Sequence, residues 1–435
     1  MHELPGANLM NSTLVADVGH GGHRHLHVRF LFDFIFNKDR ESLTRLWFYL
    51  PAETARAVTR VLGEEAAAVF SARVIQADSR KNGCSLNGVL AAVREVSARQ
   101  VLFLDIDRFI YRLTWQPLPV AVSGVWFRPN FHYSSAKFLH EGAWQRAIGI
   151  LKRGVARVLC ARAGIRRLFV FDAAAADYAT RQFGTDKVRY LPDPFAFPAQ
   201  TGPKPLPGRR ERIVFAIVGS ISRRKGIFSF LAALELLAPE DQLRIELRIV
   251  GRTEESETAL LTEIITRASE STLAKITYRN EFVSDEAIDL AIVEADVLLL
   301  LYRRFIGSSG LMIRAALLGR PVVATRYGLI GAMVNRHCLG LTVDPYDHAG
   351  IARAITRVID GGPLGYDAAA ARRFAAMHSP ELYVNGLYEL IADAVPEVPA
   401  IGLVAAVDSQ AALAPAGAPA QSLSGYVRAE GSRHG

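Results

Sequence analysis

Short apolar segments rich in β-branched residues recur along the chain, and a longer stretch with helical spacing follows each of them. In the first half these segments are STLVADV, RLWFYL, QVLFLDI, LPVAVSGVWF, RLFVFD and VRYL; in the second half they are RIVFAIVG, LRIELRIVG, KITYRNEF, ADVLLLLY, RPVVAT and LGLTVD. Strands that alternate with helices are typical of parallel sheets with helices packed against them. The pattern therefore predicts an α/β fold.

A proline-rich segment divides this pattern into two halves. Six prolines lie between Pro192 and Pro207, and a basic cluster follows them. Because 435 residues are too many for one compact core, we expect two domains of similar size with a cleft between the carboxyl ends of their strands. The expected parts are an N-terminal Rossmann-like domain (1–195), a linker (196–210), a C-terminal Rossmann-like domain (211–379), a helix (380–394) and a disordered tail rich in Ala, Pro, Gly and Ser (395–435).

The charge balance and the cysteines restrict the partners and the compartment. The chain has 51 Lys and Arg against 43 Asp and Glu, which favours anionic partners. Its three cysteines are far apart, and no apolar run is long enough to cross a bilayer, so a cytoplasmic protein is expected. Nucleic-acid binding is not expected, because no aromatic-rich basic strand or recognised module accompanies the charge.

Two glycine-containing loops in the second half are candidate phosphate sites. In IVFAIVGSISRRKGIFSF, Gly219 and Gly226 allow tight turns, and Arg223 and Lys225 place cations beside the start of a helix. A solvated basic loop would explain the same residues. In the second loop, GSSG, Ser308 or Ser309 can cap the helix that begins near Gly310 and can also bind a phosphate or a sugar hydroxyl.

These two segments resemble family 4 glycosyltransferases, which have the GT-B fold of two Rossmann-like domains facing across a cleft. Lys225-Gly226 stands where the family has its Lys-Gly pair, LRIVG matches the next strand, and AALLGRPVVAT is similar to the family's EAMACGxPVVA stretch. The resemblance extends over roughly residues 213–360, while the first half matches in layout only. It implies an acceptor-side N-terminal domain and a nucleotide-sugar-binding C-terminal domain.

The same resemblance implies a reaction. A sugar would pass from a nucleotide-diphosphate donor to a glycan or lipid-linked acceptor, with retained configuration and with neither a cofactor nor an obligatory metal. Two alternatives are a nucleotide-sugar hydrolase or epimerase, and a non-catalytic binding module or partner subunit.

Three positions depart from the family pattern. Ser220 stands where an Arg usually follows the first glycine, and Ile306 and Arg314 replace two glutamates that contact the donor. A guanidinium has only hydrogen-bond donors, so Arg314 cannot replace a carboxylate that accepts hydrogen bonds from ribose hydroxyls. Either the site is inactive, or the GSSG hydroxyls and Arg314 contact phosphate or sugar in an atypical transferase, which is the reading we favour.

The first half is expected to supply the acceptor side and a catalytic group. In GVWFRPNFHYSS, His132 follows a strand and is the candidate catalytic residue, because a histidine titrates near neutral pH and can bind the donor sugar or a phosphate. A surface histidine beside Tyr133 is the alternative. Asp105 and Asp107 also end a strand, where they can reach the cleft, cap a helix or pair with Arg108.

A basic amphipathic segment follows. AWQRAIGILKRGVARVLCARAGIRRLF contains seven Arg or Lys and no acid, and Trp144, Ile148, Leu151, Val155 and Val158 share one helical face. We expect this face to pack against the sheet. The alternative is peripheral docking on an anionic membrane.

Four histidines crowd the sequence GHGGHRHLH after the first strand. His23 and His27 share a helical face, but no acidic or cysteine ligand lies nearby, so a metal site is not expected. Gly21 and Gly22 instead indicate a turn that lets the backbone approach the donor. His20 and His23 are further ligand contacts in this interpretation, whereas His25 and His27 belong to the following helix.

Overall fold

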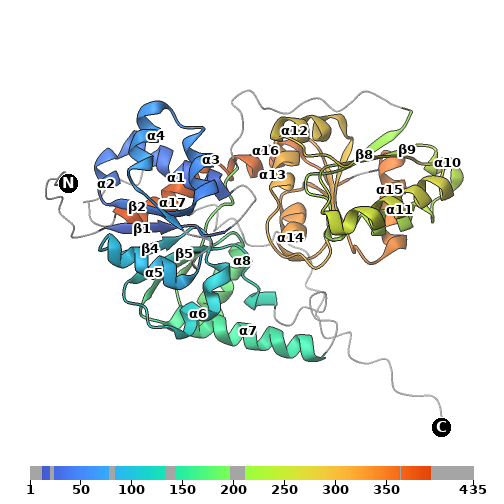
Figure 1. Ribbon diagram of the computed structural model, residues 1–435. Coiled ribbons are helices and arrows are strands. Elements are labelled where there is room, and N and C mark those ends of the chain that lie inside the picture. The colour runs from blue at the N-terminus through green and yellow to red at the C-terminus, as the bar shows by residue number, and fades with distance from the viewer. Residues whose placement is uncertain are drawn as a thin grey trace, which may run out of the picture. The chain divides into compact units, whose positions relative to one another are not determined.

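The computed structural model describes residues 12–19, 24–77, 84–133, 143–195, 211–362 and 364–392. They form two parallel sheets (Figure 1). The seven-stranded sheet has the order β3-β2-β1-β4-β5-β6-β7, and the six-stranded sheet has the order β10-β9-β8-β11-β12-β13. The strand order reverses beside β1 in the first sheet and beside β8 in the second. Open α/β sheets bind ligands at the carboxyl ends of strands at such points.

The strands of the first sheet are β1 (Thr13–Ala16), β2 (Leu46–Pro51), β3 (Val74–Ala77), β4 (Gln100–Phe103), β5 (Ala121–Trp126), β6 (Ile165–Val170) and β7 (Val188–Tyr190). Those of the second are β8 (Ile213–Val218), β9 (Ile245–Val250), β10 (Lys275–Arg279), β11 (Val297–Leu300), β12 (Val322–Thr325) and β13 (Gly340–Val343). Every segment predicted to be a strand is one. The edge strand β3 was not predicted, because its side chains are only partly buried and its four residues show no long apolar run.

Helices cover both faces of each sheet. Those of the first half are α1 (Arg24–Lys38), α2 (Arg40–Leu43), α3 (Ala52–Thr59), α4 (Glu64–Ser71), α5 (Leu86–Glu95), α6 (Ile110–Trp115), α7 (Ala143–Ala161) and α8 (Ala173–Tyr178). Those that follow are α9 (Ile227–Leu234), α10 (Pro239–Gln242), α11 (Glu255–Ser271), α12 (Asp285–Glu294), α13 (Gly310–Leu317), α14 (Gly328–Arg336), α15 (His348–Ile359), α16 (Ala368–Ala376) and α17 (Pro380–Ala392). None of these described helices is long and apolar enough to span a membrane.

The core of each half is divided by its sheet. Along β1, Leu14 and Ala16 join one apolar cluster, and Val15 joins the cluster on the opposite face. Along β8, Phe215 and Val214 alternate in the same way. A strand that buries successive side chains on opposite faces reads as a continuous apolar run, which is why the sequence revealed the strands so clearly.

The last helix returns to the first sheet. The helix expected over 380–394 is observed as α17, which lies beside α1 in Figure 1. Tyr383 of α17 is fully buried, and its hydroxyl lies 2.9 Å from Nδ1 of His27. The Gln100 side-chain amide also donates to the Leu390 carbonyl at 2.8 Å. Residues of α17 therefore complete the apolar core of the first half. The expected linker (196–210) and tail (395–435) lie outside the described residues.

One helix differs from expectation. We expected Trp144, Leu151 and Val158 of α7 to pack against the sheet, but these side chains are exposed. The buried face instead consists of Val155, Ala156, Leu159 and Cys160. The helix has apolar residues on more than one face, so helical spacing alone selected the wrong one.

Candidate functional site

The turn after β8 depends on two glycines with left-handed backbone angles. Gly219 has φ +85°, and a side chain there would begin 3.6 Å from Nζ of Lys225. Gly226 has φ +75°, and a Cβ atom there would lie 2.1 Å from the carbonyl oxygen of Leu301. Both positions are strained for other residues, and Gly226 has no room for a side chain. The glycines thus bring the Lys225 ammonium to the carboxyl end of β8.

Lys225 is a buried cation without an acidic partner. The residue is 4% exposed, and its Nζ donates to the carbonyl oxygen of Val218 at 2.6 Å. Nζ also lies 5.5 Å from the ring centroid of Tyr302. Among the described residues no carboxylate forms an ion pair with Lys225. Buried charges are normally paired, so this ammonium is suited to an anion supplied by a ligand.

The two arginines before Lys225 point elsewhere. The Arg223 side chain is 55% exposed and lies 3.5 Å from one carboxylate oxygen of Glu257, and the other oxygen accepts a 3.0 Å hydrogen bond from the Arg223 backbone N–H. The Arg224 guanidinium stacks over Phe305 at 4.6 Å. Ser220 is exposed at the turn. The structure therefore brings Lys225 to the glycine turn and holds the Arg223 side chain at the surface with Glu257.

The start of α13 lies beside this turn, since a Cβ atom at Gly219 would also be 3.9 Å from Cδ1 of Leu311. Ser309 is the residue before the helix, but its hydroxyl makes no capping bond and lies 3.4 Å from the Tyr302 hydroxyl. The Ser308 hydroxyl is hydrogen-bonded to Asp193. The expectation that one of these serines caps α13 is therefore wrong. The first N–H groups of a helix lack intrahelical partners, so the Gly310 end of α13 faces the turn with donors for an anion.

Arg314 is held by α12. Its side chain is 7% exposed and lies 2.6 Å from Asp285 and 3.2 Å from Asp289. Its guanidinium also stacks over the Phe195 ring at 4.7 Å. These contacts occupy the guanidinium within the protein. They were not predictable from the sequence, because Asp285 lies 29 positions away.

His132 is buried, which excludes the surface position considered as an alternative. Its side chain is 6% exposed, and Nε2 lies 2.8 Å from a carboxylate oxygen of Asp172. The Tyr133 hydroxyl donates to the same oxygen at 2.9 Å, and burial with this carboxylate raises the pKa of Tyr133 well above its usual range. Asp172 therefore fixes the ring, and Nδ1 is left buried without a hydrogen-bond partner among the described residues.

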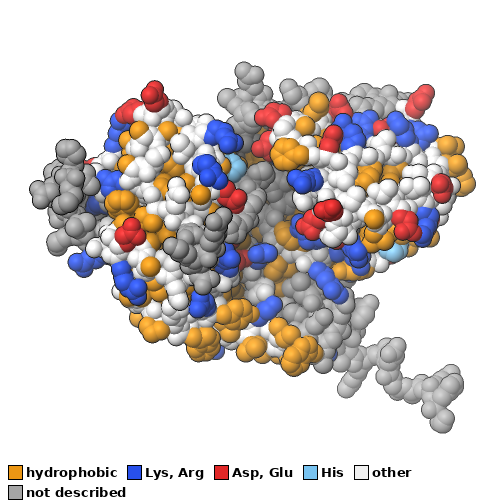
Figure 2. Space-filling view, viewed as in Figure 1, with side chains coloured by type: hydrophobic (Ala, Val, Ile, Leu, Met, Phe, Trp, Pro, Cys, Tyr) orange, Lys and Arg blue, Asp and Glu red, His pale blue; other side chains and the backbone are white. Residues whose placement is uncertain are grey.

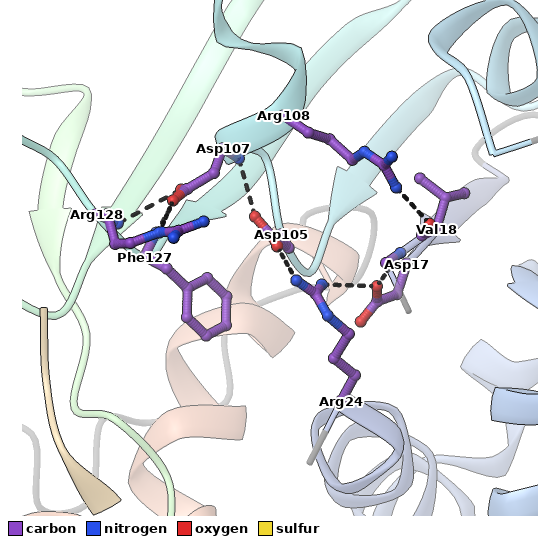
Figure 3. Close-up of polar contacts among 9 residues, drawn as sticks. Asp17, Val18, Arg24, Asp105, Asp107, Arg108, Phe127 and Arg128 are labelled. Carbon is purple, nitrogen blue, oxygen red and sulfur yellow. Dashed lines mark hydrogen bonds and ion pairs between the residues drawn. The ribbon is translucent and has the colours of Figure 1, made fainter. Parts of the chain in front are cut away.

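A second polar cluster lies at the carboxyl ends of β1 and β4 (Figure 3). Arg24, the first residue of α1, bridges Asp17 at 3.1 Å and also bonds Asp105. Burial raises the pKa of Asp17 despite the neighbouring guanidinium. Two buried carboxylates thus share one arginine. Asp17 and Arg24 were not predicted as site residues; their one signal in the sequence is that both flank the glycine-rich turn after the first strand.

Asp107 continues this cluster toward β5. Its carboxylate accepts hydrogen bonds from Arg128 Nε at 3.0 Å and from the Phe127 backbone at 2.8 Å. Burial, with repulsion from Asp105, raises the pKa of Asp107 to about 6. The pairing with Arg108, one of the alternatives considered for Asp105 and Asp107, is not observed; Arg108 donates to the Val18 carbonyl at 2.6 Å.

These side chains border a cavity of about 820 Å³. Its charged lining in the first half is Arg24, Asp105, Asp107, Arg108, Arg128 and Lys152. Cations outnumber carboxylates in this set, so the cavity suits a polar ligand with negative charge. His132 does not line it. Gly21, Gly22, His20 and His23 lie outside the described residues, so their expected ligand contacts stay predictions.

Comparisons with known proteins agree with this architecture. Residues 212–361 match the family described as glycosyl transferases group 1. No curated protein sequence matches the chain.

Solved structures give the fold. HepE from Anabaena, in complex with UDP and glucose, is 14% identical, with a TM-score of 0.56 over 88% of this chain and 100% of that chain. Sucrose-phosphate synthase from Thermosynechococcus elongatus is 17% identical, with a TM-score of 0.56 over 92% of this chain and 100% of its own. The apo form of the lipopolysaccharide outer core galactosyltransferase WaaB is 13% identical, with a TM-score of 0.59 over 89% of this chain and 100% of its own. The chain has the GT-B fold.

Proposed function

We propose that this protein is a glycosyltransferase that moves a sugar from a nucleotide-diphosphate donor to a glycan or lipid-linked acceptor. One observation carries the proposal: Lys225 is buried beside Gly219 and the first turn of α13, and no described carboxylate pairs with its ammonium. The family match over residues 212–361 and a fold like that of the UDP-bound HepE support it.

In this proposal the donor diphosphate lies against Gly219, Lys225, Ser309 and Gly310. Negative charge grows on the diphosphate as the glycosidic bond to it breaks, and a preorganised ammonium with helix N–H groups stabilises that charge. Arg223 and Ser220 stand at the rim of the turn, where an Arg223 released from Glu257 reaches the same phosphates. Arg314 serves as a structural ion-pair residue in this site. Retention of configuration and independence from an obligatory metal are parts of the proposal that rest on the family resemblance.

The acceptor is proposed to enter the cavity beside Asp105 and Asp107. Asp107 takes up and releases a proton near pH 6, so it can accept a hydrogen bond or a proton from an acceptor hydroxyl at neutral pH. His132 remains the proposed catalytic contact to the donor sugar; because Asp172 already holds Nε2 and Nδ1 is buried, this contact requires Nδ1 to become exposed when the donor binds. We place the reaction in the cytoplasm, where the protein would meet its acceptor at the inner face of the membrane.

One observation favours a second candidate, a non-catalytic nucleotide-sugar-binding protein. Ile306 and Arg314 offer no carboxylate at the positions of the family's paired glutamates, and Arg314 is already bound by Asp285 and Asp289. A binder would take up nucleotide sugar and release no nucleoside diphosphate, whereas a hydrolase or epimerase would convert the donor without an acceptor.

Isothermal titration of the full chain with UDP-, GDP-, ADP- and dTDP-sugars tests the donor site first. The proposal expects one family of donors to bind with a Kd below about 1 mM, which corresponds to about 4 kcal/mol. A folded sample that binds none of these donors at millimolar concentration would overturn it. Incubating the bound donor with and without acceptor fractions then separates transfer from hydrolysis and from binding alone.

A further inference from the structure

The helices α6 and α7 carry an exposed apolar surface. On α7, Trp144 is 77% exposed and Leu151 is 64% exposed, while Val155 and Leu159 of the same helix are buried. Six of the 15 exposed large apolar side chains among the described residues belong to these two helices: Tyr111, Trp115, Trp144, Ile150, Leu151 and Val158. We call these six residues the α6–α7 surface. Figure 2 shows hydrophobic side chains gathered at this edge of the first half.

The two helices pack against each other, so their exposed residues belong to one region. Tyr111 and Trp115 stand four positions apart on α6, and Trp144, Leu151 and Val158 repeat at intervals of seven on α7. Such spacings place residues on one side of a helix. Apolar surface gathered in this way on a monomer marks an interaction site more often than a single exposed side chain does.

The charges on these helices have one sign. The sequences IYRLTW and AWQRAIGILKRGVARVLCA contain no acid, and their cations are Arg112, Arg146, Lys152, Arg153 and Arg157. Arg112, Arg146 and Arg157 are exposed and form no ion pair with any described residue. An apolar face bordered by unpaired cations is complementary to a surface that has an apolar interior and an anionic outer layer.

We propose that the α6–α7 surface docks on a lipid bilayer that contains anionic headgroups. Tryptophan and tyrosine combine a large apolar ring with a polar group, which suits the boundary between headgroups and acyl chains. Each nearby Arg or Lys adds attraction to an anionic leaflet. A second copy of this chain fits less well, because a symmetric contact would bring the five cations of one copy against the five of the other.

The cavity beside Asp107 shares α7 with this surface. Lys152 and Val155 line the cavity, and Leu151 is exposed to solvent. Docking through α7 would therefore hold the proposed acceptor site close to the bilayer. This last step rests on the proposed function, whereas the docking itself does not.

Vesicle flotation of the full chain tests the docking without any substrate. We expect binding to vesicles with 30% phosphatidylglycerol in phosphatidylcholine, weaker binding to pure phosphatidylcholine, and release as salt rises, because screening shortens the reach of the charges. Trp144→Ser with Leu151→Ser should lower binding at least about tenfold. Arg146→Gln with Arg157→Gln should lower it about 25-fold, because each cation near the surface contributes roughly fivefold.

Phe282→Ser with Leu290→Ser is the matched control, because these residues of the second half are 80% and 58% exposed and carry no role in the proposal. The control should float like the wild type, and circular dichroism should show that every variant is folded. The proposal is overturned if the wild-type chain does not bind anionic vesicles or if the Trp144 and Leu151 variant binds them as well as the control. It is also overturned if size-exclusion chromatography shows that these substitutions dissolve a dimer while no vesicle binding is seen. Donor titration is independent of all these outcomes, so loss of docking and loss of the proposed function can be told apart.

Discussion

Nζ of Lys225 lies 2.6 Å from the carbonyl oxygen of Val218, the last residue of β8, and no described carboxylate neutralises it. The chain thus ends a central strand with a positive charge that is held in place before any ligand arrives. Gly219 and Gly226 make this arrangement possible, because each lets the backbone turn where a side chain would be strained or would collide.

Gly226→Ala should strongly destabilise the second half. Gly226 has φ +75°, and a Cβ atom there would lie 2.1 Å from the Leu301 carbonyl oxygen. The alanine would therefore adopt a strained backbone angle, and the neighbouring backbone would also have to move. Gly184→Ala is the matched control, since Gly184 has φ +68° and nothing within 4 Å of the added atom. In urea denaturation we expect a loss of about 1 kcal/mol for Gly184→Ala and at least about 3 kcal/mol for Gly226→Ala. Equal losses in the free energy of unfolding for the two variants would show that the backbone around Leu301 moves aside at little cost.

Arg314→Met should reduce stability more than it reduces donor affinity. The guanidinium pairs with Asp285, which is half exposed, and Asp289, and leaving these carboxylates without it should cost about 1–3 kcal/mol after allowance for solvent screening. The free energy of unfolding and the donor Kd, measured on the same sample, separate the two roles. A donor affinity that falls more than about tenfold in a variant of unchanged stability would restore Arg314 to the donor site.

Asp107 should make the protein less stable as pH rises from about 4 to about 6.5. Its pKa in the folded chain is about 6, above the unfolded value, so the folded state holds the proton more tightly and loses that advantage when the proton leaves. His378, whose pKa is lowered to about 4 by burial, acts in the opposite direction over the same range. The test is therefore the difference in the free energy of unfolding between wild type and Asp107→Asn, which should change by up to about 3 kcal/mol across this window. A constant difference would show that Asp107 ionises normally.

His132→Gln should lower kcat for transfer by about 10²-fold or more and leave the donor Kd within a few-fold, because the proposed contact acts on the reacting sugar. Tyr133→Phe is the control: it removes the other side-chain hydrogen bond to Asp172 and keeps the aromatic ring. It should retain most of the turnover. Equal effects of the two substitutions on stability, with unchanged kcat, would make the His132–Asp172 pair a packing feature only.

The fold was predictable because the central strands of a parallel sheet are buried on both faces. Such strands appear in the sequence as continuous apolar runs, as in IVFAIV and VLLL. The exposed edge strand β3 lacks this signal. The glycine-lysine turn was also predictable, since its chemistry is local in sequence.

The polar partners were not predictable, because they join elements that are distant in sequence. Arg24 meets Asp105 across 81 positions, and His132 meets Asp172 across 40. Helical spacing placed the residues of α7 on one face but did not identify which face the sheet covers. That choice depends on neighbouring helices, and it decides whether Trp144 is core or surface.

The affinity for nucleoside diphosphate in wild type and in Lys225→Met tests the central claim most directly. Lys187→Met is the matched control, because Lys187 Nζ also donates to a backbone carbonyl, that of Arg162, at 2.7 Å, but in the first half. By titration calorimetry on folded samples, we expect Lys225→Met to weaken binding of the preferred nucleoside diphosphate by about 10²-fold, as for a charge-assisted phosphate contact, and Lys187→Met to leave it unchanged. Equal affinity in wild type and Lys225→Met would contradict the account, because the buried ammonium would then not be the group that binds the phosphates.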